Sequence, residues 1–372
     1  MDDRERLMLL NLIPDIGSLR ATRLLETFGT LNSLFAATED QLRQVDGIGP
    51  VLAQRLVAGC RNTALLDEEW RLVRQAGCSV VTLLDAGYPA LLKQIHDPPL
   101  VLYLKGRWAE ADQTAIGVVG SRRASVYGQQ TAERLAYELA SRGVTIVSGL
   151  ARGIDAAAHR GALKAHGRTV AILGNGLTQI YPPEHAQLAK QIAEHGVVVS
   201  EYPMWMEPLA RNFPRRNRVI SGLSLGVVIV EAAKRSGALI TADCALEQGR
   251  EVFAVPGKVD SLTSQGTHHL LKQGAQLVTS VDDILEELRL EPVLVSQDVH
   301  DASPVAHTRL VSGVTDDERR ILEHLERDEP RDVDTVAAET GLAASTCAAT
   351  LLGLELKRLV KQLPGKRFVQ SA

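Results

Sequence analysis

The feature that most constrains the fold is a repeated alternation of short apolar runs and amphipathic helical patterns, from about residue 112 to residue 290. The apolar runs are TAIGVV, VTIVSG, RTVAILG, VVVSEYP, GVVIVEA and EVFAVPG, with glycine-rich loops after them. Helical patterns such as YGQQTAERLAYELASRG (127–143) and IDAAAHRGALKAHG (154–167) lie between the runs. Short β-branched strands that alternate with helices indicate an α/β fold with a doubly wound, mostly parallel, Rossmann-like sheet.

The N-terminal region contains an internal repeat, in which IPDIGSLRATRLL (13–25) aligns with VDGIGPVLAQRLV (45–57). The second copy resembles a helix-hairpin-helix, where glycines such as Gly47 and Gly49 permit a tight turn that presents backbone N–H groups to a phosphate. The first copy has Asp15 where the first of these glycines would fall. A helical packing unit that touches no DNA explains the repeat equally well.

The C-terminal region predicts three helices and two short strands around a Pro-Gly turn, the pattern of a winged helix. Ser345 or Thr346 can cap the third helix, which we expect to run to about Leu359. This helix is poor in base-reading side chains, so the domain could contact phosphates through its wing or bind another protein. The expected organisation is a small all-α domain over 1–66, an extended Rossmann-like domain over 67–290, a linker over 291–312 and a winged helix over 313–372.

Composition excludes several classes of protein. Of the 372 residues, 45% are hydrophobic, but no apolar run approaches 18 residues and the N-terminus MDDRERLMLL is charged. We therefore expect no membrane insertion and a cytoplasmic location. The 4 cysteines are scattered without a CxxC pair, which favours reduced thiols.

The loops after the strands indicate the chemistry of the ligand. In an open parallel sheet, ligands bind beyond the carboxyl ends of the strands, and these loops share glycine, small hydroxyls and arginine. Such residues suit phosphate, because arginine presents bidentate donors and glycine permits close approach. The interpretation that competes for the stretch NFPRRNRVISGLS (212–224) is a solvated basic turn. We expect one crevice to be lined by Arg122, Arg152, Arg215, Arg216 and Arg218, with Phe213 positioned to stack a base.

Known catalytic patterns are missing from these loops. GNGLTQ lacks the third glycine of a dinucleotide fingerprint, and the sequence contains neither GxxxxGK[ST] nor GxSxG. His159 and His166 are better interpreted as packing or surface residues than as metal ligands. The sequence therefore predicts no catalytic residues, no cofactor and no metal site.

Eight motifs in order, GSRRASVYG, SGLARGID, GNGLTQIYP, SEYP, FPRRNRVISGLS, VVIVEA, SGALITA and GREVFAVPG, closely resemble the DNA-processing protein A family (DprA, also called Smf). The resemblance covers about residues 80–290. It implies a protein without catalytic activity that binds single-stranded DNA, protects incoming strands and loads the recombinase RecA during natural transformation. It also implies a homodimer formed through the Rossmann-like domain.

The family's DNA pocket maps onto Arg122 and onto the stretch from Phe213 to Arg218. The segment MWMEPLA, shortly before Phe213, contains no lysine, so we expect Arg211 to supply that charge. The resemblance and the loop chemistry together predict that DNA is bound by Gly120, Ser121, Arg122, Ser148, Gly149, Arg152, Gly153, Arg211, Phe213, Arg215, Arg216, Asn217 and Arg218.

Two alternatives belong to other functional classes. A nucleotide phosphoribohydrolase would also use glycine-rich phosphate loops, but its PGGxGTxxE signature is absent and PGKVDSLTSQGT separates PG from GT by eight residues. A winged-helix transcription regulator is disfavoured because the third helix of the C-terminal region is poor in base-reading side chains. Single-strand binding is the preferred hypothesis.

Overall fold

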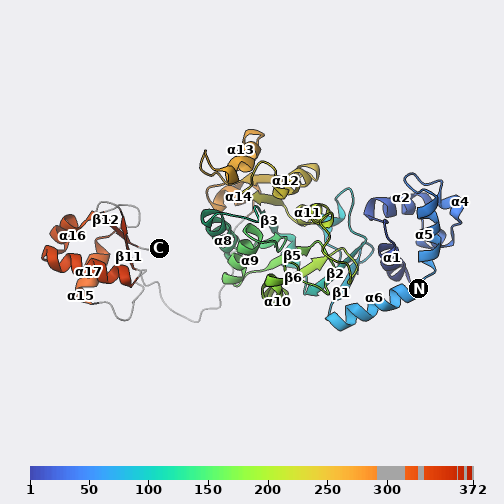
Figure 1. Cartoon of the computed structure of the whole chain (residues 1–372), viewed down its shortest axis with the longest axis horizontal. Helices are drawn as coiled ribbons and strands as arrows, with labels where there is room; N and C mark the ends of the chain where they lie inside the picture. The colour runs from blue at the N-terminus through green and yellow to red at the C-terminus, as the bar shows by residue number, and fades with distance from the viewer. Residues whose placement is uncertain (291–314, 326–330, 358, 364–366, 371–372) are drawn as a thin grey trace. The chain divides into compact units, whose positions relative to one another are not determined.

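We analysed a computed structural model of the chain, which describes residues 1–290, 315–325, 331–357, 359–363 and 367–370 (Figure 1). The chain forms two compact units, Met1–Ser296 and Gln297–Ala372, each of which is described here by itself. The predicted linker, 291–312, lies outside the described residues.

A nine-stranded sheet forms the centre of the first unit, in the order β1-β2-β6-β5-β4-β3-β7-β8-β9. All pairs from β6 to β9 are parallel, whereas β1 and β2 are antiparallel additions beside β6. The strands are β1 (Ser79–Thr82), β2 (Val101–Gly106), β3 (Ala115–Val119), β4 (Thr145–Ser148), β5 (Thr169–Leu173), β6 (Val197–Ser200), β7 (Gly226–Ile229), β8 (Glu251–Ala254) and β9 (Gln276–Leu277). The predicted doubly wound, mostly parallel sheet is therefore confirmed.

Helices cover both faces of the sheet, as a doubly wound fold requires (Figure 1). Alternate residues of one strand face opposite ways, so Val118 packs with α8 and α9 while Val119 packs with α11 and α12. Burial of each such valine contributes about 1.5–3 kcal/mol. The helices of this region are α7 (Ala90–Lys93), α8 (Val126–Ser141), α9 (Ile154–Lys164), α10 (Ala186–His195), α11 (Asn212–Gly222), α12 (Gly237–Glu247), α13 (Gln265–Lys272) and α14 (Val281–Glu287).

The arginine-rich stretch is a helix, α11, and the interpretation of it as a basic turn is wrong. Asn212, Phe213 and Pro214 occupy the first turn of α11, where backbone N–H groups have no intrahelical acceptor. Proline is tolerated there because the missing N–H would have bonded to nothing within the helix.

Six short helices precede the sheet and pack into a core that they share with it. They are α1 (Asp3–Leu12), α2 (Ser18–Phe28), α3 (Leu31–Ala36), α4 (Glu39–Leu42), α5 (Pro50–Cys60) and α6 (Thr63–Ala76). Polar contacts also join the two layers, since Asn11 donates to the carbonyl of Glu201 at 3.2 Å and Glu69 accepts from Met204 N–H at 2.7 Å. The predicted all-α N-terminal region is confirmed, and it is attached to the edge of the sheet.

The second unit has the predicted winged-helix pattern, with one additional strand, β10 (Arg331–Asp332). Its sheet order is β10-β12-β11. The third helix begins after Ala343 and not after a Ser or Thr cap, and it ends at Leu356, before the expected Leu359. The other elements are α15 (Asp316–Glu323), α16 (Val333–Thr340), α17 (Ala344–Leu356), β11 (Val360–Leu363) and β12 (Arg367–Gln370).

Within the described residues, no single helix has the length and apolar character needed to cross a membrane. Taken together, Val333–Thr340 and Ala344–Glu355 reach that length and composition, but the two helices are bent by 109°.

Candidate nucleic-acid interface

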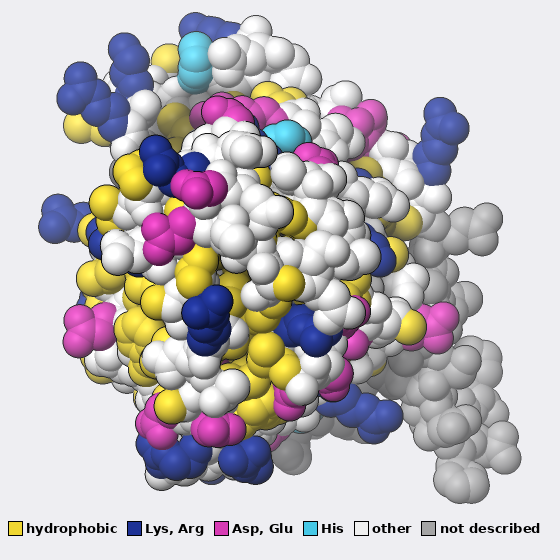
Figure 2. Space-filling model, turned by 90° about the vertical axis from the view of Figure 1, so that its right-hand side faces the viewer, with side chains coloured by type: hydrophobic (Ala, Val, Ile, Leu, Met, Phe, Trp, Pro, Cys, Tyr) yellow, Lys and Arg dark blue, Asp and Glu magenta, His cyan; other side chains and the backbone are white. Residues whose placement is uncertain are grey.

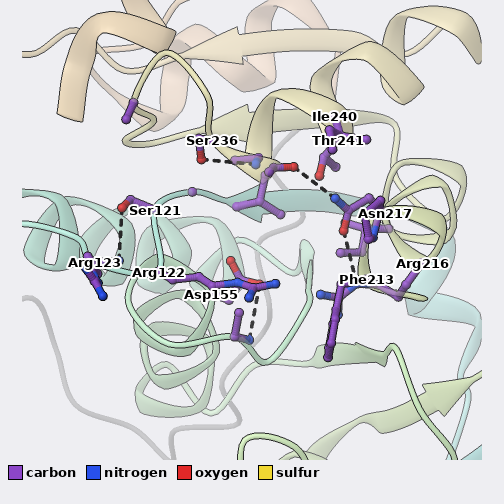
Figure 3. Close-up of a pocket in the computed structure, with 18 of the residues that line it drawn as sticks. Ser121, Arg122, Arg123, Asp155, Phe213, Arg216, Asn217, Ser236, Ile240 and Thr241 are labelled. Carbon is purple, nitrogen blue, oxygen red and sulfur yellow. Dashed lines mark hydrogen bonds between the residues drawn. The ribbon is translucent and has the colours of Figure 1, made fainter. Parts of the chain in front are cut away.

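A crevice of about 590 Å³ opens at the carboxyl end of β3. In the sheet, β3 lies between β4 and β7: β4, β5 and β6 follow it on one side, and β7, β8 and β9 follow on the other. Such a switch point separates the loops of neighbouring strands and leaves room for a ligand. Arg122, Asp155 and Phe213 lie along one wall of the crevice, and Ser236, Ile240 and Thr241 lie on the opposite wall (Figure 3).

Arg122 and Phe213 are in contact at one side of the crevice. The Arg122 guanidinium lies over the Phe213 ring, with 5.3 Å between its central carbon and the ring centroid. Arg122 is exposed and forms no ion pair with any described residue, whereas Phe213 is half-buried. The structure therefore brings the predicted phosphate ligand and the predicted stacking ring together.

The surroundings of Phe213 limit how a base can reach it. A Cβ atom on Gly174 would lie 2.8 Å from the ring, so only a glycine fits against the ring at that position. Tyr181 forms a tilted pair with Phe213, with 5.5 Å between the ring centroids. The face that Arg122 covers can be opened by movement of that side chain.

Arg216 forms part of the crevice wall, but its side chain is only 3% exposed. The guanidinium donates to the carbonyls of Gly149, at 2.6 Å, and Ile172. Burial lowers the pKa of Arg216 to about 10, an effect that the nearby Asp155 carboxylate opposes. Arg216 therefore holds the loop after β4 and supplies positive charge from within the wall.

Asp155 lies in the first turn of α9 and is buried. Burial raises its pKa, although Arg216 and the backbone N–H groups of Ala151 and Gly149 act in the opposite direction. Its carboxylate accepts from Gly149 N–H at 3.1 Å and from Ala151 N–H at 3.4 Å. The Asp155 carboxylate thus holds the loop that carries Gly149, and the carbonyl of Gly149 accepts from Arg216.

Arg218 is directed away from the crevice, contrary to our prediction. Its guanidinium forms ion pairs with Glu201 and with Asp97, the latter at 3.0 Å, and its side chain is mostly buried. Burial opposes the charge, but the two carboxylates outweigh it and raise the pKa of Arg218. Successive residues of a helix are about 100° apart, so Arg218 cannot share the orientation of Arg216.

The remaining predicted arginines lie around the edge of the site. Arg152 lines a small side lobe of the crevice with Tyr181, and it is paired with Glu184. Arg211 immediately before α11 and Arg215 in its second turn are exposed, and neither is among the residues that line the crevice.

The predicted small residues have different roles. Gly120 and Ser121 line the crevice, and Gly149 lines its side lobe. Ser148 is buried and donates to the carbonyl of Val118 at 2.6 Å, so it is not placed to meet a ligand. Gly153 precedes α9.

Asn217 lines the crevice and donates to the carbonyl of Gly237 at 3.1 Å. This hydrogen bond connects α11 to the first turn of α12, which supplies much of the opposite wall. The motif SGALITA contains the residues of that wall, but the loop-based reasoning did not use it because they lie on a helix and not on a loop.

Glu231 connects three loops and was not predicted to do so. Its carboxylate accepts from Ser125 N–H at 2.8 Å and from the Thr263 hydroxyl at 2.6 Å, while its backbone carbonyl accepts from Ser121 N–H at 2.6 Å. The loops after β3, β7 and β8 therefore share one buried carboxylate.

The N-terminal hairpins show a reciprocal pairing. Asp15 of the first copy forms an ion pair with Arg55 of the second at 2.6 Å, and Asp46 of the second pairs with Arg23 of the first at 2.8 Å. Asp15 has a φ of 68°, close to the 80° of Gly47, so both turns place this residue in the left-handed region. Basic and acidic side chains are interspersed on the face seen in Figure 2.

Comparison with known proteins identifies the family. The profile of DNA recombination-mediator protein A matches residues 79–289. Protein Smf of Synechocystis sp. is 34% identical over 383 residues, with 96% of each chain covered. This chain belongs to the DprA family. Profiles of the DprA winged helix domain and of the SAM-like helix-hairpin-helix tandem match residues 305–366 and 7–62.

Other DprA family members agree with this assignment. Protein Smf of Escherichia coli is 44% identical over 288 residues, which cover 75% of this chain and 74% of that protein. The X-ray structure of DprA from Streptococcus pneumoniae superposes with a TM-score of 0.68 and 35% identity, covering 77% of this chain and 98% of that one. A structure from Helicobacter pylori, described as showing a single-stranded DNA binding mode of DprA, has a TM-score of 0.51 and 30% identity, covering 57% of this chain and 95% of that one.

Proposed function

We propose that this chain binds single-stranded DNA in the crevice, with Arg122 as the phosphate ligand and Phe213 as the base-stacking surface. The observation that supports this most directly is the contact between an exposed, unpaired guanidinium and a half-buried aromatic ring at a sheet switch point. Single strands offer both phosphates and unpaired bases, and aromatic stacking tolerates any base.

The other predicted residues support the site in different ways. Gly120, Ser121 and Gly149 allow close approach, Asn217 positions α12, and Arg216 contributes charge from the wall. Arg211 and Arg215 are exposed beside Phe213 and would meet phosphates that leave the crevice. Arg152 would join them once a phosphate displaces Glu184.

Membership of a recombination-mediator family supports the wider role. We propose that the protein protects incoming strands and loads RecA onto them during natural transformation, acting in the cytoplasm as a homodimer formed through the Rossmann-like domain. Binding, and not catalysis, is the proposed activity, since Asp155 of the crevice lining and the buried Glu231 that bonds to Thr263 both accept hydrogen bonds that maintain the loops.

A weaker second contact is proposed at the N-terminal hairpins. Gly49 immediately precedes α5, and Gly47 and Gly49 are exposed, so backbone N–H groups at this helix start can donate to a phosphate. The interspersed charges of this region suit an auxiliary role.

A competition titration with matched single-stranded and duplex oligonucleotides tests the main proposal. We expect a preference for the single strand without strong sequence preference, and a steep decrease in affinity with salt because phosphate contacts release counterions. Arg122→Ala should reduce the salt dependence by about 0.7 per lost phosphate contact without lowering the melting temperature. Arg160→Ala, on an exposed position of α9, serves as the control.

Equal affinity for duplex and single strand, or an Arg122→Ala variant indistinguishable from wild type, would contradict the proposal. A parallel assay with nucleoside monophosphates addresses the alternative enzymatic function, since hydrolysis that requires the crevice would establish it instead.

A further inference from the structure

Four exposed cations gather on the side of the crevice that the proposed site does not use. Arg123 follows β3, Lys234 and Arg235 follow β7, and Lys258 follows β8. Because these strands are parallel, the loops after them meet at the same edge of the sheet. We call these four residues the second arm.

The cations of the second arm have no ion-pair partners among the described residues. The adjacent Glu231 is buried and already accepts two hydrogen bonds, and Asp260, on the loop after β8, forms no ion pair either. Arg152 and Arg218, by contrast, are paired with carboxylates. Like charges held together without counter-charges favour an anionic ligand over solvent.

The crevice connects the second arm to the Phe213 side. Its lining includes Arg123, Thr263 and Phe213, and Arg123 lies on the opposite side of the crevice from Phe213 (Figure 3). Glu231 fixes this geometry, because it holds Ser125 and Thr263 against each other. A ligand that enters beside Phe213 can therefore reach Arg123, the member of the second arm that lines the crevice.

An aromatic side chain lies beside the second arm. Tyr127 is 55% exposed, and its hydroxyl donates to the carbonyl of Pro256 at 3.3 Å, which places the ring between the loops after β3 and β8. Val126 and Leu262 are also exposed. An exposed ring next to unpaired cations repeats the combination seen at Arg122 and Phe213.

We propose that the second arm is a distinct binding subsite for the same DNA strand, in which its cations bind phosphates and Tyr127 stacks a base. The proposal rests on the function proposed above and extends it, because it requires a strand longer than the segment that contacts Phe213. Short oligonucleotides then occupy only the Phe213 side, whereas longer ones occupy both.

Titrations with short (about 5 nucleotides) and long (about 20 nucleotides) oligothymidines test this length dependence. The variant Lys234→Ala/Arg235→Ala/Lys258→Ala should bind the long strand at least about tenfold more weakly, with a salt dependence reduced by about 2. Its affinity for the short strand should not change.

The control is Lys105→Ala/Arg107→Ala/Lys190→Ala, which removes the same charge. Lys105 lies opposite Val198 of β6, and Gly106 lies opposite Val197, where β6 begins. Lys105 and Arg107 are therefore near the amino ends of the parallel strands, whereas the crevice lies at their carboxyl ends. This variant should bind both strands nearly as wild type does. Loss of long-strand affinity in the control as well would show a non-specific effect of net charge and overturn the subsite.

Tyr127 provides an independent test. Tyr127→Ala should weaken binding of the long strand about fivefold or more, whereas Tyr127→Phe retains the ring and should bind normally. If Tyr127→Phe and Tyr127→Ala weaken binding equally, the hydrogen bond to Pro256 and not stacking is responsible. If both variants bind normally, Tyr127 takes no part. Either result shows that the base-stacking role is wrong.

The outcomes separate the two proposals. A wild-type protein that binds neither strand contradicts the proposed function itself. A wild-type protein that binds both strands through Arg122, combined with a second-arm variant of unchanged affinity at every length, contradicts only the subsite. In that case the exposed cations and apolar side chains would serve a protein partner instead.

Discussion

Arg215, Arg216 and Arg218 lie within one turn of α11, and each has a different environment. Arg215 is exposed, Arg216 is enclosed by carbonyl oxygens, and Arg218 is paired with two carboxylates. The helix rotates by about 100° per residue, so neighbouring side chains are directed to different surroundings. Whether an arginine of α11 can reach a ligand therefore depends on the direction of its side chain, and not only on the residue type.

Substitution of the two enclosed arginines should affect folding before binding. Arg216→Met removes the donor to the carbonyls of Gly149 and Ile172 and the nearby positive charge that favours the buried Asp155 carboxylate. Arg218→Glu adds a third acid beside Asp97 and Glu201. Each should reduce the free energy of unfolding by about 3–5 kcal/mol. Urea melts measure this, with Arg215→Met as the matched control; wild-type melts for both variants would show that these buried contacts are dispensable.

Phe213→Ala should weaken single-strand binding by about 1–3 kcal/mol. The ring is half-buried against Gly174 and Tyr181, so the loss of unfolding free energy should be smaller than the about 3–5 kcal/mol of a fully buried phenylalanine. Strand titrations and denaturant melts on the same preparation distinguish the two effects. If Phe213→Ala lowered the free energy of unfolding by the full amount expected for a buried phenylalanine, and its folded fraction bound the strand as tightly as wild type, Phe213 would be a core residue only.

Among the loop residues, sequence reasoning placed Arg122 and Gly120 well. Arg122 and Gly120 follow a strand directly, and the rule that ligands bind beyond strand ends places them at the crevice. Arg218 was misplaced because its partner Asp97 is distant in sequence, and because side-chain direction on a helix depends on where the helix begins. The role of Glu231 was not predicted, since nothing local in the sequence indicates that it accepts from Thr263.

At the scale of elements, α9 and β5 share a buried imidazole. Thr169 donates its hydroxyl hydrogen to the carbonyl of Ile146, so the same oxygen must accept from His159 Nδ1–H, at 2.7 Å. His159 Nε2 is buried without a partner among the described residues. Burial, together with His185, Arg216 and Arg160, lowers the pKa of His159 to about 3.

The low pKa of His159 predicts that the stability of the folded chain depends on pH. Between pH about 6.5 and 3 the unfolded chain binds a proton at His159 that the folded chain does not, so the folded state loses stability as the pH falls. The loss should reach about 2 kcal/mol at pH 5. Melts of wild type and His159→Asn at pH 7.5 and 5 measure it, and an equal pH dependence in both proteins would rule out His159 as the source.

Strand prediction succeeded where apolar runs alternate with helices and was incomplete elsewhere. All six apolar runs named from the sequence contain observed strands, β3 to β8. The strand β9 has only two residues, both exposed, and so carries no periodic signal. The strands β1 and β2 pair antiparallel outside the repeating pattern from which the sheet was inferred.

For the whole molecule, the division into two units predicts independent behaviour. The crevice and its supporting contacts lie within Met1–Ser296. Removal of residues 297–372 should therefore leave the affinity for a short oligothymidine and the melting temperature of the first unit unchanged. A large loss of short-strand affinity after truncation would show that the winged helix takes part in binding.

The contact between Arg122 and Phe213 also has a kinetic consequence. While the guanidinium lies over the ring, an arriving strand meets charge before it meets an aromatic surface. The association rate constant should therefore follow ionic strength and Arg122. Once a phosphate has drawn the guanidinium away, the uncovered ring can hold a base, so Phe213 should govern mainly the residence time of the strand.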